Sequence, residues 1–127
     1  MADHPDPAEK MASGMKRIST HILDLAVGKP ASHVAVRLEK HEPSGWRLLA
    51  SEQTDRDGRC SQLLPEKENL SPGFYRLAFD TTSYYEAQDI DALYPVVEVT
   101  FRVREGEAQF HIPLLLSPNG YTTYRGS

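Results

Sequence analysis

Phe110-His111-Ile112-Pro113-Leu114-Leu115-Leu116 is followed by Ser117-Pro118-Asn119-Gly120 and then, after three residues, by Tyr124-Arg125-Gly126-Ser127. The first segment is an apolar run with the length of a buried strand, and the second has the residues of a turn. These segments predict a hairpin near the C-terminus. Chain ends usually fray, but here two strands tie a phenol, a guanidinium and a hydroxyl to the core. We therefore interpret residues 124–127, the tail, as a placed functional element.

Upstream of this hairpin, runs of apolar and β-branched residues alternate with turn signals. Strands are predicted at 18–25, 33–40, 46–54, 74–79 and 97–103, with a loop at 62–72. Asp57-Gly58 is a strong hairpin signal, with Arg59 just past the turn. Ser83 and Glu86 have the spacing of a capping box, which predicts that a short helix begins at Ser83.

Short strands with regular turns and one short helix are typical of an antiparallel β-sandwich, so we predict an all-β fold of about seven or eight strands. Residues 1–16 contain few large apolar side chains, and we expect them to be a disordered leader before a single domain at 17–127. The strands at 18–25 and 110–116 are apolar on both faces. Because a single sandwich buries only its inner faces, this favours an oligomer.

Composition excludes several classes of protein. The 127 residues, 39% of them hydrophobic and 25% charged, are enough for one domain with one core. The net charge is −4 and the Lys and Arg residues are scattered, which argues against a nucleic-acid partner. No apolar run is long enough to cross a membrane, and no signal peptide pattern is present. The single cysteine, Cys60, is compatible with a reducing compartment, so we predict a cytoplasmic location.

Three side chains are candidates for chemistry on the strands. His21 can transfer a proton near neutral pH, and it shares a strand face with Ser19 and Leu23. His111 lies in an apolar run, where an imidazole needs a partner or a cavity. Arg59 follows a turn. Each also has an ordinary interpretation, as a half-exposed strand histidine, a paired core histidine or a solvated arginine.

The tail has the same two interpretations, since Tyr124 and Arg125 could be a rim aromatic and a snorkelling charge. For His4, His33 and His41 we predict no role. The spacing of the histidines and Cys60 matches no metal-binding motif, so no metal site is predicted. No G-x-S-x-G motif or Gly-rich phosphate loop is present, which argues against covalent catalysis.

Several segments together resemble the transthyretin-like 5-hydroxyisourate hydrolases. The segments that carry this resemblance are Ser19-Thr20-His21-Ile22-Leu23-Asp24, Thr54-Asp55-Arg56-Asp57-Gly58-Arg59, His111 to Pro118 and Tyr124-Arg125-Gly126-Ser127. The resemblance runs from about Arg17 to Ser127. The terminal tetrapeptide is specific, because hormone carriers of the same fold lack it and have other residue types in place of His21, Arg59 and His111.

The resemblance implies a transthyretin-like (prealbumin-like) fold and a homotetramer with active sites in the channel between its dimers. It implies hydrolysis of 5-hydroxyisourate to 2-oxo-4-hydroxy-4-carboxy-5-ureidoimidazoline, in urate degradation, without a cofactor. The implied catalytic residues are His21, Arg59, His111 and Ser127, and the implied substrate-binding residues are His21, Arg59, Tyr124 and Arg125. The alternative is a transthyretin-type protein that binds a small ligand without turnover.

Overall fold

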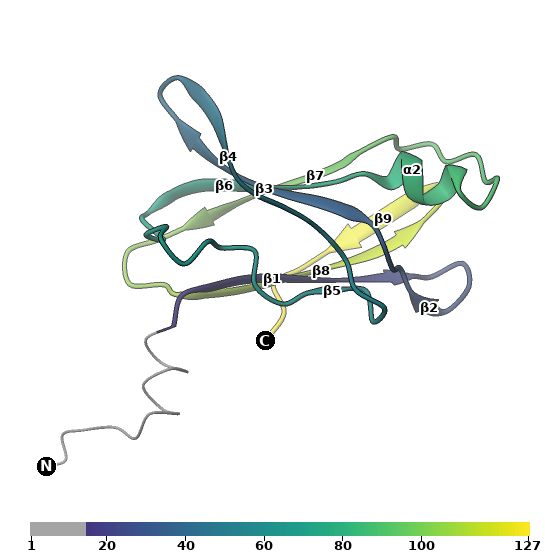
Figure 1. Cartoon of the computed structure of the whole chain (residues 1–127), viewed down its shortest axis with the longest axis horizontal. Helices are drawn as coiled ribbons and strands as arrows, with labels where there is room; N and C mark the ends of the chain where they lie inside the picture. The colour runs from purple at the N-terminus through teal and green to yellow at the C-terminus, as the bar shows by residue number, and fades with distance from the viewer. Residues whose placement is uncertain (1–14) are drawn as a thin grey trace, which may run out of the picture.

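The computed structural model describes residues 15–127, which form a two-layer β-sandwich with one short helix, α2 (Thr81–Glu86), at one end (Figure 1). This confirms the predicted all-β sandwich with one short helix. The predicted leader, residues 1–16, falls almost entirely outside the described residues. The residues that are described include no helix long and apolar enough to cross a membrane.

The two sheets share the strands almost equally. The first sheet has the order β2 (Lys29–Pro30), β1 (Arg17–Asp24), β8 (Gln109–Ser117) and β9 (Gly120–Thr123), with β5 (Arg59–Cys60) also paired to β1. The second has the order β4 (Gly45–Gln53), β3 (Ala35–Glu42), β6 (Gly73–Phe79) and β7 (Val97–Val103). The strand positions predicted from sequence are confirmed to within two residues at each end, apart from the short β2 and β5.

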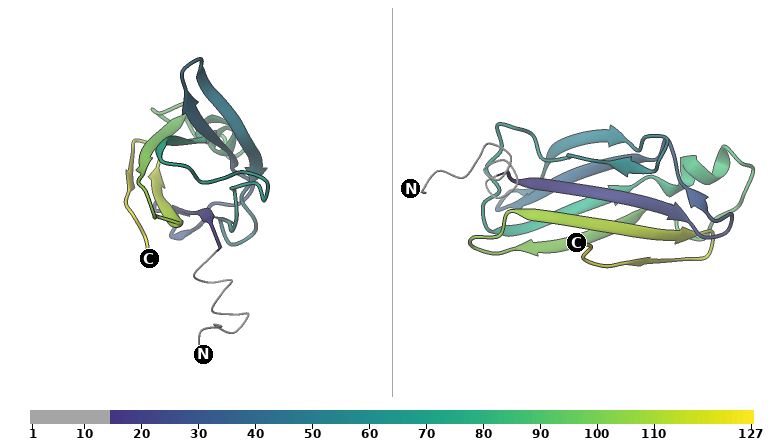
Figure 2. Two further views of the ribbon diagram at one scale, coloured as in Figure 1. Left: turned by 90° about the vertical axis from the view of Figure 1, so that its left-hand side faces the viewer. Right: turned by 90° about the horizontal axis from the view of Figure 1, so that it is seen from below.

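The central pair of the first sheet, β1 and β8, runs parallel, whereas the other strand pairs of residues 15–127 are antiparallel (Figure 2). Parallel neighbours need a long connection. Here the connection is nearly the whole domain, because β1 opens it and β8 lies near its end. The first and last parts of the chain therefore lie side by side, and this places His21 and His111 on one sheet.

The core follows from alternation along these two strands. Ile18 and Ile22 of β1 and Leu114 of β8 have no exposed surface, whereas His21 and His111 are half-buried. Burying an aliphatic side chain stabilises a fold by about 1.5–3 kcal/mol. The inner face of the sheet is therefore fixed mainly by its aliphatic residues, and Ser19, His21 and His111 lie on the outer face.

The capping prediction was wrong about where α2 begins. The helix starts at Thr81, and Asp80 is its N-cap, with its carboxylate accepting a hydrogen bond from the Ser83 backbone N–H at 3.0 Å. The Ser83 hydroxyl donates to the same carboxylate at 2.7 Å, and Glu86 is the last helical residue. Asp is as good an N-cap residue as Ser, and Asp80, which comes earlier in the chain, is the one that caps the helix.

The Asp57-Gly58 prediction was half right. A turn is present, and Gly58 has a φ of +77°. A Cβ on Gly58 would lie 2.5 Å from the Ile22 carbonyl oxygen, so the turn also needs glycine for close packing on β1. The turn does not close a hairpin, however, because β4 belongs to the second sheet and β5 pairs with β1 in the first. The chain crosses between the sheets here.

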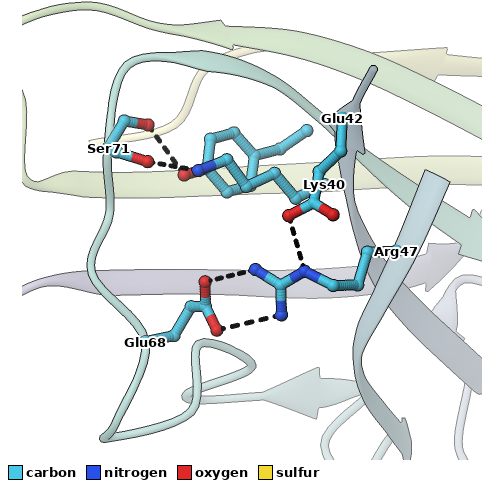
Figure 3. Close-up of polar contacts among 6 residues, drawn as sticks. Lys40, Glu42, Arg47, Glu68 and Ser71 are labelled. Carbon is cyan, nitrogen blue, oxygen red and sulfur yellow. Dashed lines mark hydrogen bonds and ion pairs between the residues drawn. The ribbon is translucent and has the colours of Figure 1, made fainter. Parts of the chain in front are cut away.

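The loop between β5 and β6 is tied to the β3–β4 hairpin by polar contacts (Figure 3). The Arg47 guanidinium bridges two carboxylates, with Nε 2.7 Å from Glu42 and Nη2 2.8 Å from Glu68. Lys40 donates to the Ser71 hydroxyl. Surface ion pairs contribute little each, but together these contacts hold the part of the loop that precedes β6.

Candidate active site

Strand register brings the predicted polar residues together on the outer face of the first sheet. His21 of β1 is the register partner of Arg59 of β5, and Ser19 of β1 is the register partner of His111 of β8. Opposed residues of neighbouring strands share a face, as do residues two apart on one strand. His21, Arg59, Ser19 and His111 therefore form one cluster on three strands.

The backbone around Arg59 is held by its own turn. The Asp55 carboxylate accepts hydrogen bonds from the backbone N–H groups of Asp57 and Arg59, each at 2.9 Å. The Asp55 N–H in turn donates to the Arg59 carbonyl at 2.9 Å. The bond from the Arg59 N–H is the main reason that the pKa of Asp55 lies below its usual range. The turn thus presents an exposed Arg59 from a well-fixed backbone.

His111 is held from the neighbouring strand. Its Nδ1 lies 2.9 Å from the hydroxyl oxygen of Ser19, a residue that is only 6% exposed. Partial burial is the main cause that lowers the pKa of His111, followed by the positive charges of His21, Arg59 and Arg17. Both effects favour the neutral imidazole, which is the form that can accept a proton near neutral pH.

The tail returns to β8 at His111. The Gly126 N–H donates to the His111 carbonyl at 2.7 Å, in the same register that pairs Leu114 with Thr123. In that register Tyr124 stands opposite Pro113, which has no N–H to donate, so the ladder is interrupted there. A Cβ on Gly126 would lie 2.6 Å from Cδ2 of His111. The tail therefore packs closely on the imidazole and needs glycine to do so.

A hollow of about 390 Å³ lies where the turn, the two strands and the tail meet. The residues that line it include Arg59, His111 and Ser127, together with Arg17, Ser19 and Arg125. Three arginines thus line one hollow, on a protein whose net charge is −4. Such a concave, cationic site suits a carbonyl-rich or anionic small molecule.

The other predicted residues lie around this hollow. His21 does not line it but stands beside Arg59. Arg125 reaches its edge, held by Glu107 at 2.9 Å and by the Gln109 carbonyl at 3.0 Å. Tyr124, 54% exposed, lines a different hollow of about 270 Å³ that also includes Val99 and Phe101. Within one chain, the tail therefore contributes to two separate surfaces.

Of the histidines for which no role was predicted, His4 lies outside the described residues, and His33 and His41 lie away from the hollow. His33 lies at a bend before β3 with a φ of +62°, and His41 packs edge-on against Trp46 in the second sheet. Burial raises the pKa of the Cys60 thiol to about 11, so it is a poor nucleophile at neutral pH. Residues 15–127 contain no group of three or more His, Cys, Asp or Glu side chains that could hold a metal ion.

Sequence reasoning missed Ser19, Arg17 and Gly126 as members of the site. Ser19 was placed on the same strand face as His21, but nothing local indicated that His111 would lie beside it, since the β1–β8 pairing spans the domain. The signal available for Gly126 was its place within a functional tail, because a glycine between polar residues often marks a close approach.

Comparisons with known proteins agree with this geometry. The model of the HIUase/Transthyretin family matches residues 18–126. The 5-hydroxyisourate hydrolase of Salmonella typhi is 45% identical over 121 residues, which cover 95% of this chain and 88% of that protein. The 5-hydroxyisourate hydrolase of Mus musculus is 43% identical over 119 residues, covering 92% of this chain and 100% of that protein.

Solved structures of a hydrolase and of a transthyretin are both similar to this chain. The 5-hydroxyisourate hydrolase of Klebsiella pneumoniae has a TM-score of 0.76 and 31% identity, covering 87% of this chain and 99% of that one. The transthyretin of Sparus aurata has a TM-score of 0.80 and 34% identity, covering 87% of this chain and 96% of that one. The chain therefore belongs to the HIUase/Transthyretin family.

Proposed function

We propose that this protein is a hydrolase that opens the six-membered ring of 5-hydroxyisourate at its amide carbonyl, yielding 2-oxo-4-hydroxy-4-carboxy-5-ureidoimidazoline in urate degradation. The observation that carries the proposal is the convergence of Arg59, His111 and Ser127 on one hollow from a turn, a strand and the tail. Relatives 37–45% identical are named 5-hydroxyisourate hydrolases, and a further relative is named a uric acid degradation bifunctional protein.

The reaction requires three functions that these side chains can supply. A base takes a proton from water as the oxygen attacks the carbonyl carbon. A positive group stabilises the oxyanion that forms, and an acid protonates the ring nitrogen as the C–N bond breaks. The hollow offers a neutral imidazole at His111 and a guanidinium at Arg59. Proton transfer and charge stabilisation suffice for this step, so the proposal includes no cofactor.

We assign roles within the proposed site as follows. One of His21 and His111 activates water, and the other acts with Arg59 to orient and polarise the substrate. Ser127 positions the substrate ring or the attacking water. Tyr124 and Arg125 bind the substrate; for Tyr124 this role needs a second chain, since its side chain lines a separate hollow within one chain.

A homotetramer with its active sites in a channel between dimers is the assembly we propose. Strands β7 and β9 are the edges of their sheets, and edge strands offer unpaired backbone groups to a second copy. Leu25 and Val27, after β1, and Tyr121 on β9 expose 58%, 55% and 41% of their surface, which a second copy could cover. Light scattering tests this, and a stable mass near the 14.3 kDa of one chain would refute it.

The alternative, a carrier that binds a small ligand without turnover, shares the fold but not the site. The Sparus aurata transthyretin has a TM-score of 0.80, so the backbone does not separate the two functions. Named hydrolases at 37–45% identity favour turnover. We further propose that residues 17–127 act as one domain and that the protein is cytoplasmic, in keeping with the single free Cys60.

The decisive experiment is an absorbance assay on freshly generated 5-hydroxyisourate. We expect the protein to accelerate its decay well beyond the spontaneous rate, with the ring-opened carboxylate as product. Decay at the spontaneous rate, together with tight binding of the intact ring, would favour the carrier instead.

A further inference from the structure

The imidazole of His111 is held by protein atoms at two places on its ring. At one, Nδ1 lies 2.9 Å from the hydroxyl oxygen of Ser19. At the other, Cδ2 lies close enough to Gly126 that an added Cβ would approach it to 2.6 Å. Because Nε2 is bonded to Cδ2 in the ring, Nε2 lies toward the Gly126 side. The tail side of the ring therefore carries the nitrogen that Ser19 does not contact.

Ser19 is well placed to determine which ring nitrogen of His111 is free to accept a proton. It is 6% exposed and sits directly opposite His111 in the β1–β8 register, so its position is set by the strand. A serine hydroxyl can donate or accept one hydrogen bond at Nδ1. When the imidazole takes up a proton, however, both nitrogens carry hydrogen, and Ser19 can then only accept from Nδ1–H.

The charged groups around His111 make the acceptor hydroxyl of Ser19 important. The charged or titratable groups around His111 are His21 and Arg17 on β1 and Arg59 on β5, whose positive charges act on its ring, and Arg125 in the tail, which lines the same hollow. The first three disfavour a positive imidazole. The hydroxyl of Ser19 thus offsets part of a cationic environment at the moment when His111 becomes charged.

We propose that Ser19 is the positioning residue of His111: its hydroxyl accepts the hydrogen bond from Nδ1–H, so that Nε2 takes the proton of the attacking water. In this step an O–H bond of water breaks, its proton moves to Nε2, and the water oxygen bonds to the substrate carbonyl carbon. The proton then passes to the ring nitrogen as the C–N bond breaks. This inference rests on the proposed hydrolase function and assigns the base that the function left open between His21 and His111.

Three substitutions at Ser19 test the proposal. Ser19→Thr keeps the hydroxyl. Ser19→Val has the shape of threonine but no hydroxyl, and Ser19→Ala removes the hydroxyl and leaves only a methyl group. We expect Ser19→Thr to keep kcat within about threefold, and the other two to lower kcat about 10-fold, the scale of one lost hydrogen bond. KM should stay within about twofold. Ser51→Ala, at an exposed serine of β4, is the matched control and should leave kcat unchanged.

The pH profile distinguishes a positioning role from a merely structural one. Removing the acceptor for Nδ1–H disfavours the imidazolium, so the pKa of His111 falls further and its neutral form persists to lower pH. The acidic limb of the kcat/KM profile should therefore move to lower pH in Ser19→Ala and Ser19→Val, while the plateau drops. An unchanged limb, or a kcat within about twofold of the parent, would overturn the proposal.

Histidine ¹⁵N NMR makes the test independent of turnover. We expect the neutral His111 of the parent protein to carry its hydrogen on Nδ1, and Ser19→Ala to shift the population toward the Nε2–H tautomer. A parent protein with Nε2–H would contradict the inference whether or not the enzyme is active. A parent protein that is inactive on 5-hydroxyisourate but has the Nδ1–H tautomer would instead refute the proposed function and leave the positioning contact supported.

Discussion

The turn that carries Arg59 and the tail that carries Ser127 reach the same hollow but are held in different ways. The turn is fixed by two backbone hydrogen bonds to the Asp55 carboxylate and by close packing of Gly58 on β1. The tail beyond Thr123 is joined to β8 by a bridge at Gly126 and by Arg125, whose guanidinium donates to the Gln109 carbonyl and pairs with Glu107. The turn is thus held by several local contacts, whereas the tail depends on a few long-range contacts.

This difference teaches where the site is vulnerable. Loss of a contact in the turn should be absorbed by the others, whereas loss of a contact in the tail should displace functional groups. Positioning to within a fraction of an ångström is what such a site requires. Substitutions in the tail should therefore affect turnover more than stability, and substitutions beneath the turn should affect stability more than turnover.

The largest effect is expected from deleting residues 124–127. The aliphatic core lies upstream, in β8 residues such as Ile112 and Leu114, so the sandwich should still fold. Turnover should be abolished, because the deletion removes Ser127, Arg125 and the packing on His111. Circular dichroism checks that the truncated protein folds, and the absorbance assay checks that its turnover is lost. A truncated protein with kcat/KM within a few-fold of the parent would show that the tail is an ordinary chain end.

The next effect is that of single alanine substitutions at His21, His111 and Arg59. Each should lower kcat/KM by roughly 10²-fold or more, the usual scale for a lost acid-base or electrostatic group. Light scattering should return the same assembly as for the parent. His33→Ala is the control and should have little effect, since His33 lies at a bend outside the hollow. Equal losses for His33 and His21 would mean that the wrong histidines were chosen.

A smaller effect is expected from Gly126→Ala. The added Cβ would lie 2.6 Å from Cδ2 of His111, so the ring or the tail must move. We expect kcat/KM to fall about 10-fold with a nearly unchanged melting temperature, because the clash is local. Gly120→Ala is matched to it, since a Cβ there would meet only the Ser117 oxygen at 3.8 Å and should be tolerated. Similar losses in the two variants would argue against the packing of tail on imidazole.

The smallest effect on turnover should come from Asp55→Ala, which tests the turn. The pKa of Asp55 is lower in the folded protein than its usual value, so its carboxylate stabilises the fold above about pH 4, and that contribution is lost as the pH falls through the folded pKa. The melting temperature of Asp55→Ala should therefore lie below that of the parent at pH 7 and approach it near pH 3. Equal melting temperatures for Asp55→Ala and the parent at pH 7 would contradict this role of the carboxylate.

Sequence patterns predicted the elements of the fold better than their partners. Alternation along residues 97–103 and the apolar run before Ser117 identified strands directly, because burial of one face or both imposes a period. The neighbour of β1 could not be read in this way. Its parallel pairing with β8 depends on the path of the whole domain, and that pairing is what places Ser19 beside His111.

The local errors have local causes. Two capping residues, Asp80 and Ser83, compete within one turn of α2, and pattern alone does not rank them. The Asp57-Gly58 turn has the backbone of a hairpin turn, but the strand after it is only two residues long and joins the other sheet. For the site, the resemblance named the residues, and the structure adds their arrangement around the hollow.

A double-mutant cycle between the two halves of the site tests the central claim most directly. Arg59→Ala and Ser127→Ala would be made singly and together, and kcat/KM on 5-hydroxyisourate measured for all four proteins. If the turn and the tail act on one bound substrate, the double variant should be little worse than the poorer single variant, because groups that act as a unit are not additive. Losses that simply multiply would mean that Arg59 and Ser127 act independently, and would contradict a shared site.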